Sequence, residues 1–166
     1  LMSFVTNQIT SGNYSIIEMN VSPENENSSV NILHFGQAGL GLPDRDYYFK
    51  SDSVSVTIQN AYKNYLTTLF KLTDTKNADE NAAIAYGIEK KLAASHKTRI
   101  ERRNVKANYN KMAVSDINKS QPNIGWSKLL NQLNLKADAL DIKQPAYYKE
   151  LNTLLASVSI SDWKTY

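Results

Sequence analysis

The spacing of hydrophobic residues changes near residue 40. Before that point, the stretch 14–21 has Ile17, Met19 and Val21 at every second position. In the stretch 30–35, Val30 and Ile32 lie on one face of a strand and Leu33 and Phe35 on the other. A period of two is typical of β-strands. The polar connection between them, 22–29, is rich in turn-forming residues. Residues 1–38 therefore predict a small antiparallel β-hairpin segment.

Beyond residue 50 the apolar residues recur at helical spacing. The stretch 53–72 carries one continuous apolar stripe. Later helix starts are signalled by a capping-box pattern from Asn77 to Glu80, by Pro145 as a first helical residue, and by a second capping box from Ser159 to Asp162. We expect a mainly α fold in a single domain over 1–166, divided into a β-hairpin segment at 1–38, an elbow at 39–50 and a helical segment at 51–166.

The elbow, residues 39–50, combines glycine, proline, charge and aromatic residues in one dense run. Gly39 and Gly41 permit a sharp turn, and Pro43 suits the first turn of a helix. Arg45 lies between Asp44 and Asp46, so the sequence predicts a structural ion network rather than an acid–base pair. Asp46 and Lys50 have the spacing of a helical ion pair.

The charge of the chain is modest overall but unevenly distributed. The formal net charge is +3, yet residues 1–60 hold six acids and two bases, and eight bases and two acids lie between Glu89 and Lys111. A basic stretch of this kind suits either a nucleic-acid or anionic-membrane surface or a solvated protein face. We favour the solvated face, because no aromatic residues interleave with the bases as in nucleic-acid motifs. We expect no nucleic-acid partner.

Few residues of the chain carry catalytic chemistry. There is no cysteine, and the two histidines, His34 and His96, have no histidine partner at i+4. A zinc peptidase centre needs two such histidines, a glutamate and a further ligand. We therefore expect both histidines to be ordinary surface or core residues. Glu89 falls within an otherwise apolar helical stripe and needs a partner, for which Arg103 is the candidate.

The run Gly-Leu-Gly-Leu-Pro-Asp-Arg-Asp-Tyr-Tyr at 39–48 resembles the hallmark of the neprilysin family of zinc metallopeptidases, which includes the endothelin-converting enzymes and bacterial endopeptidase O. Shorter matches follow in the same order along nearly the whole chain, up to the closing Trp163–Tyr166. The similarity is to the amino-terminal, non-catalytic half of those enzymes. The positions that match the family's structural motif are Gly39, Leu40, Gly41, Leu42, Pro43, Asp44, Arg45, Asp46, Tyr47, Tyr48, Glu89, Arg103, Tyr109 and Asn110.

The chain departs from the family pattern at two places. Asn104-Val105 follows Arg103 where the family has Asp-Pro, and Ala113 stands where the family has a threonine after Tyr-Asn-Lys-Met. Losing that hydroxyl removes a helix N-cap worth ~1 kcal/mol.

The resemblance implies a function for the whole protein. A neprilysin-like enzyme hydrolyses short peptides with a zinc ion carried by its later half, and this piece would shape and restrict the substrate cavity without holding zinc or catalytic residues. Its partners would be the zinc-bearing half and peptide substrates, and an extracytoplasmic location is favoured. No stretch is long enough to span a membrane. The chain stops three residues after Trp163, which predicts a truncated piece. The alternative is a stand-alone helical interaction module.

Overall fold

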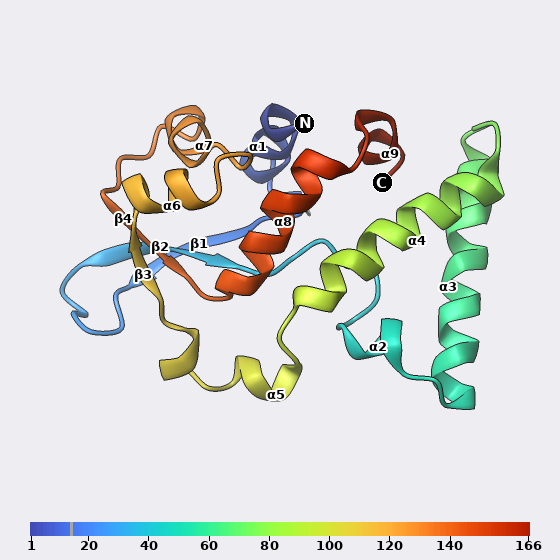
Figure 1. The fold of residues 1–166 in the computed structure, drawn as a ribbon, viewed down its shortest axis with the longest axis horizontal. Helices are drawn as coiled ribbons and strands as arrows, with labels where there is room; N and C mark the ends of the chain where they lie inside the picture. Colours follow the sequence, from blue (N-terminus) through green and yellow to red (C-terminus); the bar gives the residue numbers. More distant parts are fainter. Residues whose placement is uncertain (14) are drawn as a thin grey trace. The chain divides into compact units, whose positions relative to one another are not determined.

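The computed structural model describes residues 1–13 and 15–166, and the chain in these residues is mainly helical with a small sheet. The elements in chain order are α1 (Met2–Thr10), β1 (Glu18–Pro23), β2 (Asn31–Gly36), α2 (Asp46–Phe49), α3 (Ser53–Leu72), α4 (Ala78–Ser95), α5 (Arg99–Arg102), the 3₁₀ helix η1 (Lys106–Asn108), β3 (Lys111–Ala113), α6 (Val114–Ser120), α7 (Trp126–Gln132), β4 (Ala139–Ile142), α8 (Pro145–Ser157) and α9 (Ile160–Thr165) (Figure 1). The expectation of a mainly α fold is confirmed. No helix in the described part combines the length and apolar character needed to cross a membrane.

The chain forms two compact units that interleave along the sequence. Unit 1 contains Leu1–Gly39 and Arg99–Ser157, and unit 2 contains Leu40–Thr98 and Val158–Tyr166. All four strands belong to unit 1, whereas unit 2 is built from α2, α3, α4 and α9. That residues 1–166 form a single domain stays a prediction.

The predicted hairpin is present in unit 1. Strands β1 and β2 pair antiparallel from Glu18 opposite Gly36 to Pro23 opposite Asn31. The first strand begins later than the alternation suggested, and Tyr14 lies outside the described residues. The polar connection expected at 22–29 closes the hairpin, and Pro23 ends its edge strand, where a missing backbone N–H is tolerated.

The segment 51–166, expected to be helical, also contains two short strands. Strands β3 and β4 join the hairpin in a four-stranded sheet of order β1-β2-β4-β3, with β4 parallel to β2 and antiparallel to β3. Three or four residues are too few to show a strand period in sequence. Their partners lie far away in the chain, so no local turn signal announces them.

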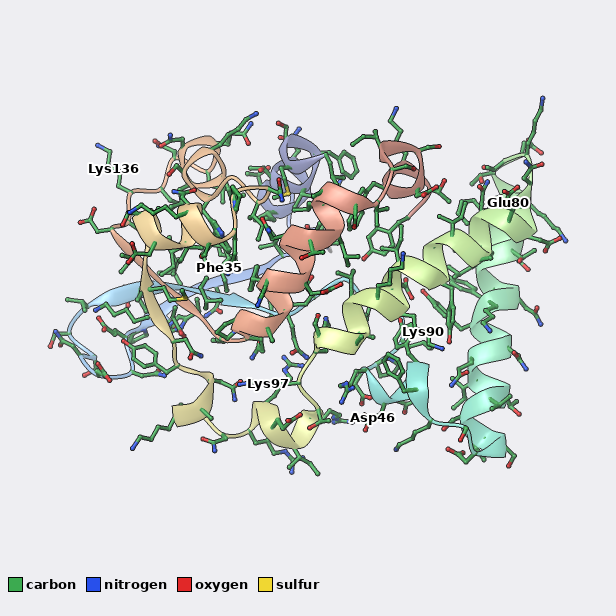
Figure 2. The ribbon with its side chains drawn as sticks, viewed as in Figure 1. Phe35, Asp46, Glu80, Lys90, Lys97 and Lys136 are labelled. Carbon is green, nitrogen blue, oxygen red and sulfur yellow. The ribbon has the colours of Figure 1, made fainter. Side chains whose placement is uncertain are left out.

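Aromatic residues form the centre of unit 1. Phe35 of β2 meets Trp126 of α7 edge-on, with 5.0 Å between ring centroids, and also contacts Tyr148 of α8. All three side chains are buried, and Figure 2 shows Phe35 between the sheet and the helices beside it. Pro145 begins α8 as predicted, which positions Tyr148 to donate its hydroxyl to the Gly36 carbonyl at 2.7 Å.

Unit 2 is organised around the pair α3 and α4. The predicted helix over 53–72 is confirmed, and Asp52 caps it by accepting from the Ser55 N–H at 3.0 Å. The capping box at Asn77 is wrong: Asn77 adopts a left-handed conformation and makes no side-chain cap bond. The second box is confirmed, because Ser159 accepts from the Asp162 N–H at 3.0 Å and α9 begins at the next residue, Ile160.

Ala113 occupies the N-cap position of α6 and makes no side-chain cap bond. We expect Ala113→Thr to raise the free energy of unfolding by about 1 kcal/mol, because the new hydroxyl can accept an unpaired N–H of the first turn. Chemical denaturation measures the change. Ala113→Val is the matched control, since it adds the same bulk to an exposed position without a hydroxyl. Equal stability of the two variants would contradict the capping explanation.

Candidate functional site

The residues of the elbow converge on Glu89 of α4. The Tyr48 hydroxyl donates to Glu89 Oε2 at 2.7 Å, and the Tyr62 hydroxyl of α3 donates to Oε1 at 2.8 Å. The Gly41 N–H also bonds to this carboxylate. We call Glu89, Tyr48, Tyr62 and Gly41 the elbow lock. It joins the elbow, α3 and α4 through one buried side chain.

Tyr48 connects the two ends of the elbow. Its hydroxyl accepts from the Leu42 N–H at 3.0 Å while donating to Glu89. Its ring is buried beside Tyr86, at 5.6 Å between centroids. Burial raises the pKa of Tyr48 far above the usual range, so the hydroxyl keeps its proton and remains a donor. The elbow is thus closed on itself by one side chain.

Gly39 and Gly41 serve different purposes. Gly39 has a φ of 82°, the left-handed conformation that glycine adopts without strain. At Gly41 the constraint is space, because a Cβ there would collide with the Tyr62 hydroxyl and approach Glu89 Oε1 to 3.2 Å. The two glycines, two residues apart in the sequence, predicted a turn. They did not reveal that Tyr62 and Glu89 approach Gly41 closely.

The partners of Glu89 are not the expected Arg103. The donors to its carboxylate are two tyrosine hydroxyls and a backbone N–H, all from unit 2. Sequence reasoning found that the carboxylate needs a partner and missed Tyr62. The only sequence signal for Tyr62 was its position on the apolar stripe of α3.

The ion network predicted around Arg45 is also wrong. Arg45 Nε donates to the Ala93 carbonyl at 3.4 Å, and its guanidinium lies 5.6 Å from the centre of the Phe49 ring. Asp44 instead accepts from the Asp46 N–H at 2.9 Å, forming a local turn ahead of α2. Pro43 precedes α2 and is not in its first turn. Asp46 does pair with Lys50, at a separation of 4.0 Å in an exposed position.

Phe49 is held between two cations. Lys90 of α4 places its ammonium 5.6 Å from the centre of the ring, the same distance as Arg45 (Figure 2, where Asp46 marks α2 and Lys90 marks α4). A cation over an aromatic face contributes roughly 0.5–1 kcal/mol at an exposed site. Arg45 therefore contacts α2 through an aromatic ring, whereas Lys50 pairs with a carboxylate.

Two further motif residues, Tyr109 and Asn110, lie in a polar cluster of unit 1. The Tyr109 hydroxyl and the Lys111 ammonium each donate to Glu24 Oε1 at 2.6 Å, and these bonds hold the pKa of Glu24 below its usual range. The Asn110 N–H donates to Asp141 Oδ1 at 2.7 Å. Tyr109 and Asn110 thereby tie the entry of β3 to the hairpin and to β4.

Both histidines are buried, where the sequence had left open a surface or a core position. His34 is buried and bonds Asp141 Oδ2 through Nδ1 at 2.7 Å, at the point where β2 and β4 pair. His96 is also buried and belongs to unit 2. Within residues 1–13 and 15–166, no three His, Asp or Glu side chains gather as a metal site. Sequence reasoning missed Asp141, whose only signal is an acid inside the short apolar stretch of β4.

Comparisons with known proteins give one consistent family. The amino-terminal model of Peptidase family M13 matches residues 2–166. Endothelin-converting enzyme 1 of Cavia porcellus is 30% identical over 146 residues, covering 81% of this chain and 19% of the relative. Endothelin-converting enzyme-like 1 of Rattus norvegicus is 29% identical over 121 residues, or 72% of this chain and 16% of the relative.

Solved structures have the same fold. The zinc metalloprotease Zmp1 of Mycobacterium tuberculosis, in its open state, matches with a TM-score of 0.90 and 26% identity over 99% of this chain and 26% of that one. PepO of Lactobacillus rhamnosis matches with a TM-score of 0.81 at 16% identity, over 99% of this chain and 26% of that one. The chain spans about a quarter of the solved relatives and a fifth or less of the endothelin-converting enzymes.

The elbow lock predicts how stability depends on pH. Burial raises the pKa of Glu89, although its three hydrogen bonds oppose the shift. Because the folded pKa lies above the unfolded value, the contribution of Glu89 is largest below about pH 4.5 and is lost as the pH rises through the folded pKa. We expect the stability difference between the native protein and Glu89→Gln to fall with rising pH, by about 1.4 kcal/mol for each unit of pKa shift. Denaturation at a series of pH values measures this difference, with exposed Glu80→Gln on the same helix as the control. A stability difference between the native protein and Glu89→Gln that did not change with pH would refute this prediction.

Gly41→Ala tests the close approach in the elbow lock. The added methyl group would force the Tyr62 ring away from Glu89, so we expect a loss of about 1–3 kcal/mol in the free energy of unfolding. Gly87→Ala is the matched control, because that helical glycine has open space around it and alanine favours a helix. If both variants were as stable as the native protein, Gly41 would not be a packing constraint.

Proposed function

This chain belongs to peptidase family M13, and we propose that it forms part of a helical lobe bounding the substrate cavity of a zinc metalloendopeptidase. In this proposal the lobe admits short peptides and excludes folded proteins. The proposal rests on the family match over residues 2–166 and on a fold shared with the zinc metalloprotease Zmp1 over 99% of the chain.

We place the zinc outside residues 1–166. A catalytic zinc ion needs three protein ligands and a position open to water, which it activates for attack on the peptide carbonyl. The residues present here do not fit that centre. His34 and His96 belong to different units, and His34 Nδ1 is already bonded to Asp141. That this chain alone binds no zinc and cleaves no peptide stays a prediction.

The elbow lock supports a rigid role for unit 2. A zinc centre polarises any peptide carbonyl that reaches it, so selection by size must come from the geometry around the metal. Three hydrogen bonds to one buried carboxylate fix the elbow to α3 and α4. A wall built this way keeps its shape when a peptide enters.

We also propose that the enzyme acts outside the cytoplasm.

The remainder of the polypeptide is the proposed partner of α3. No residue of this 20-residue helix is buried, and its apolar stripe continues into the exposed side chains of Tyr65, Leu69 and Leu72. By contrast, Leu42 and Tyr48 of the elbow and Trp163 of α9 are buried. An apolar stripe of this length suits a protein interface.

The test uses the full-length polypeptide and this 166-residue chain side by side. We expect the full-length protein to bind zinc, to cleave peptides of about ten residues in a chelator-sensitive way, and to leave folded proteins intact, because the lobe limits entry. The isolated chain should bind no zinc and cleave nothing. Elemental analysis and quenched fluorescent peptides of graded length measure both.

The outcomes separate the proposals. Zinc and chelator-sensitive cleavage in the isolated chain would place the centre within it. Equal cleavage of folded proteins and short peptides would refute the size-selective role. A full-length protein without an H-E-x-x-H motif and without peptidase activity would favour the helical interaction module.

A further inference from the structure

The segment 99–106 concentrates the positive charge of the chain. It contains four cations, Arg99, Arg102, Arg103 and Lys106, and one acid, Glu101. The resulting charge of +3 equals the formal net charge of the whole chain, so the charges of all other residues together sum to zero. We call residues 99–106 the basic segment. It lies wholly within unit 1, and its local geometry is part of that unit.

The four cations of the basic segment are exposed and not neutralised. Ion pairs among the described residues join His34 to Asp141, Lys50 to Asp46 and Lys111 to Glu24. None of the four cations takes part in them. Exposed cations without carboxylate partners keep their full attraction for an external anionic surface.

Two aliphatic side chains lie among these cations. Ile100 is 79% exposed and Val105 is 67% exposed. No residue of α5 is buried, and Figure 1 shows α5 on the opposite side of the sheet from α6 and α7. The basic segment thus presents apolar and positively charged groups together, although the sequence favoured a solvated face over an anionic-membrane surface.

We propose that the basic segment docks on an anionic lipid membrane surface. Lys and Arg near such a surface are each attracted to its negative potential, and aliphatic side chains between them enter the boundary between headgroups and acyl chains. Nucleic acid fits less well, because the segment has no aromatic side chain on which bases could stack. A protein interface fits less well too, because the centres of such interfaces are depleted in charge and enriched in aromatic residues.

The experiment is co-sedimentation of the full-length polypeptide with vesicles of phosphatidylcholine, with and without phosphatidylglycerol. We expect binding only when phosphatidylglycerol is present, and weaker binding as salt is added. Arg99→Gln with Arg102→Gln should lower the partition coefficient on the order of tenfold or more. Ile100→Ser with Val105→Ser should lower it while leaving its salt dependence unchanged.

The control removes two equal charges elsewhere in unit 1, with Lys128→Gln and Lys149→Gln, both exposed. We expect this pair to bind vesicles nearly as well as the native protein. The proposal would be overturned if the arginine pair and the control lysine pair lost binding equally. It would also be overturned by a lack of binding to anionic vesicles, or by binding retained without Arg99 and Arg102. Cleavage of a soluble peptide, assayed in parallel, reports on the proposed peptidase function separately. Thermal melts confirm that each variant is folded.

Discussion

A single buried carboxylate links the elbow, α3 and α4 of unit 2. Glu89 is removed from water, which is costly for a charged group unless hydrogen bonds replace the lost hydration. The Tyr48 and Tyr62 hydroxyls and the Gly41 N–H supply them. Two of the donors belong to the elbow and the third to α3, so satisfying one carboxylate joins the elbow and α3 to α4. Two residues of the family motif in the elbow, Gly41 and Tyr48, meet this requirement.

Some helices were predictable because their signals are local, whereas α1 lies in the segment expected to hold only the hairpin. The stripe over 53–72, Pro145 at the start of α8 and Ser159 at the start of α9 each act within a few residues, and all three were found where the sequence placed them. The hairpin was predictable for the same reason. Strands β3 and β4 were not, because three or four residues acquire a strand conformation only from partners far away in the chain.

The site was predictable in composition but not in pairing. The sequence showed that Glu89 needed a partner and that Arg45 lay beside two carboxylates. In both cases it suggested a partner of opposite charge, because charged residues are easily recognised in a sequence. The structure uses tyrosine hydroxyls for Glu89, and a carbonyl and an aromatic ring for Arg45. A hydroxyl on an apolar stripe serves both the core and a carboxylate, which sequence patterns do not distinguish.

The interleaving of the two units constrains the order in which the chain can fold during synthesis. His34 leaves the ribosome early, but its partner Asp141 follows 107 residues later. In between, the whole stretch Leu40–Thr98 of unit 2 is made. The hairpin must therefore wait with its β2 edge unpaired until β4 emerges, and such long-range pairing slows folding and exposes strands to aggregation. Early helix formation in α3 and α4 shortens the effective distance that the later strands must close.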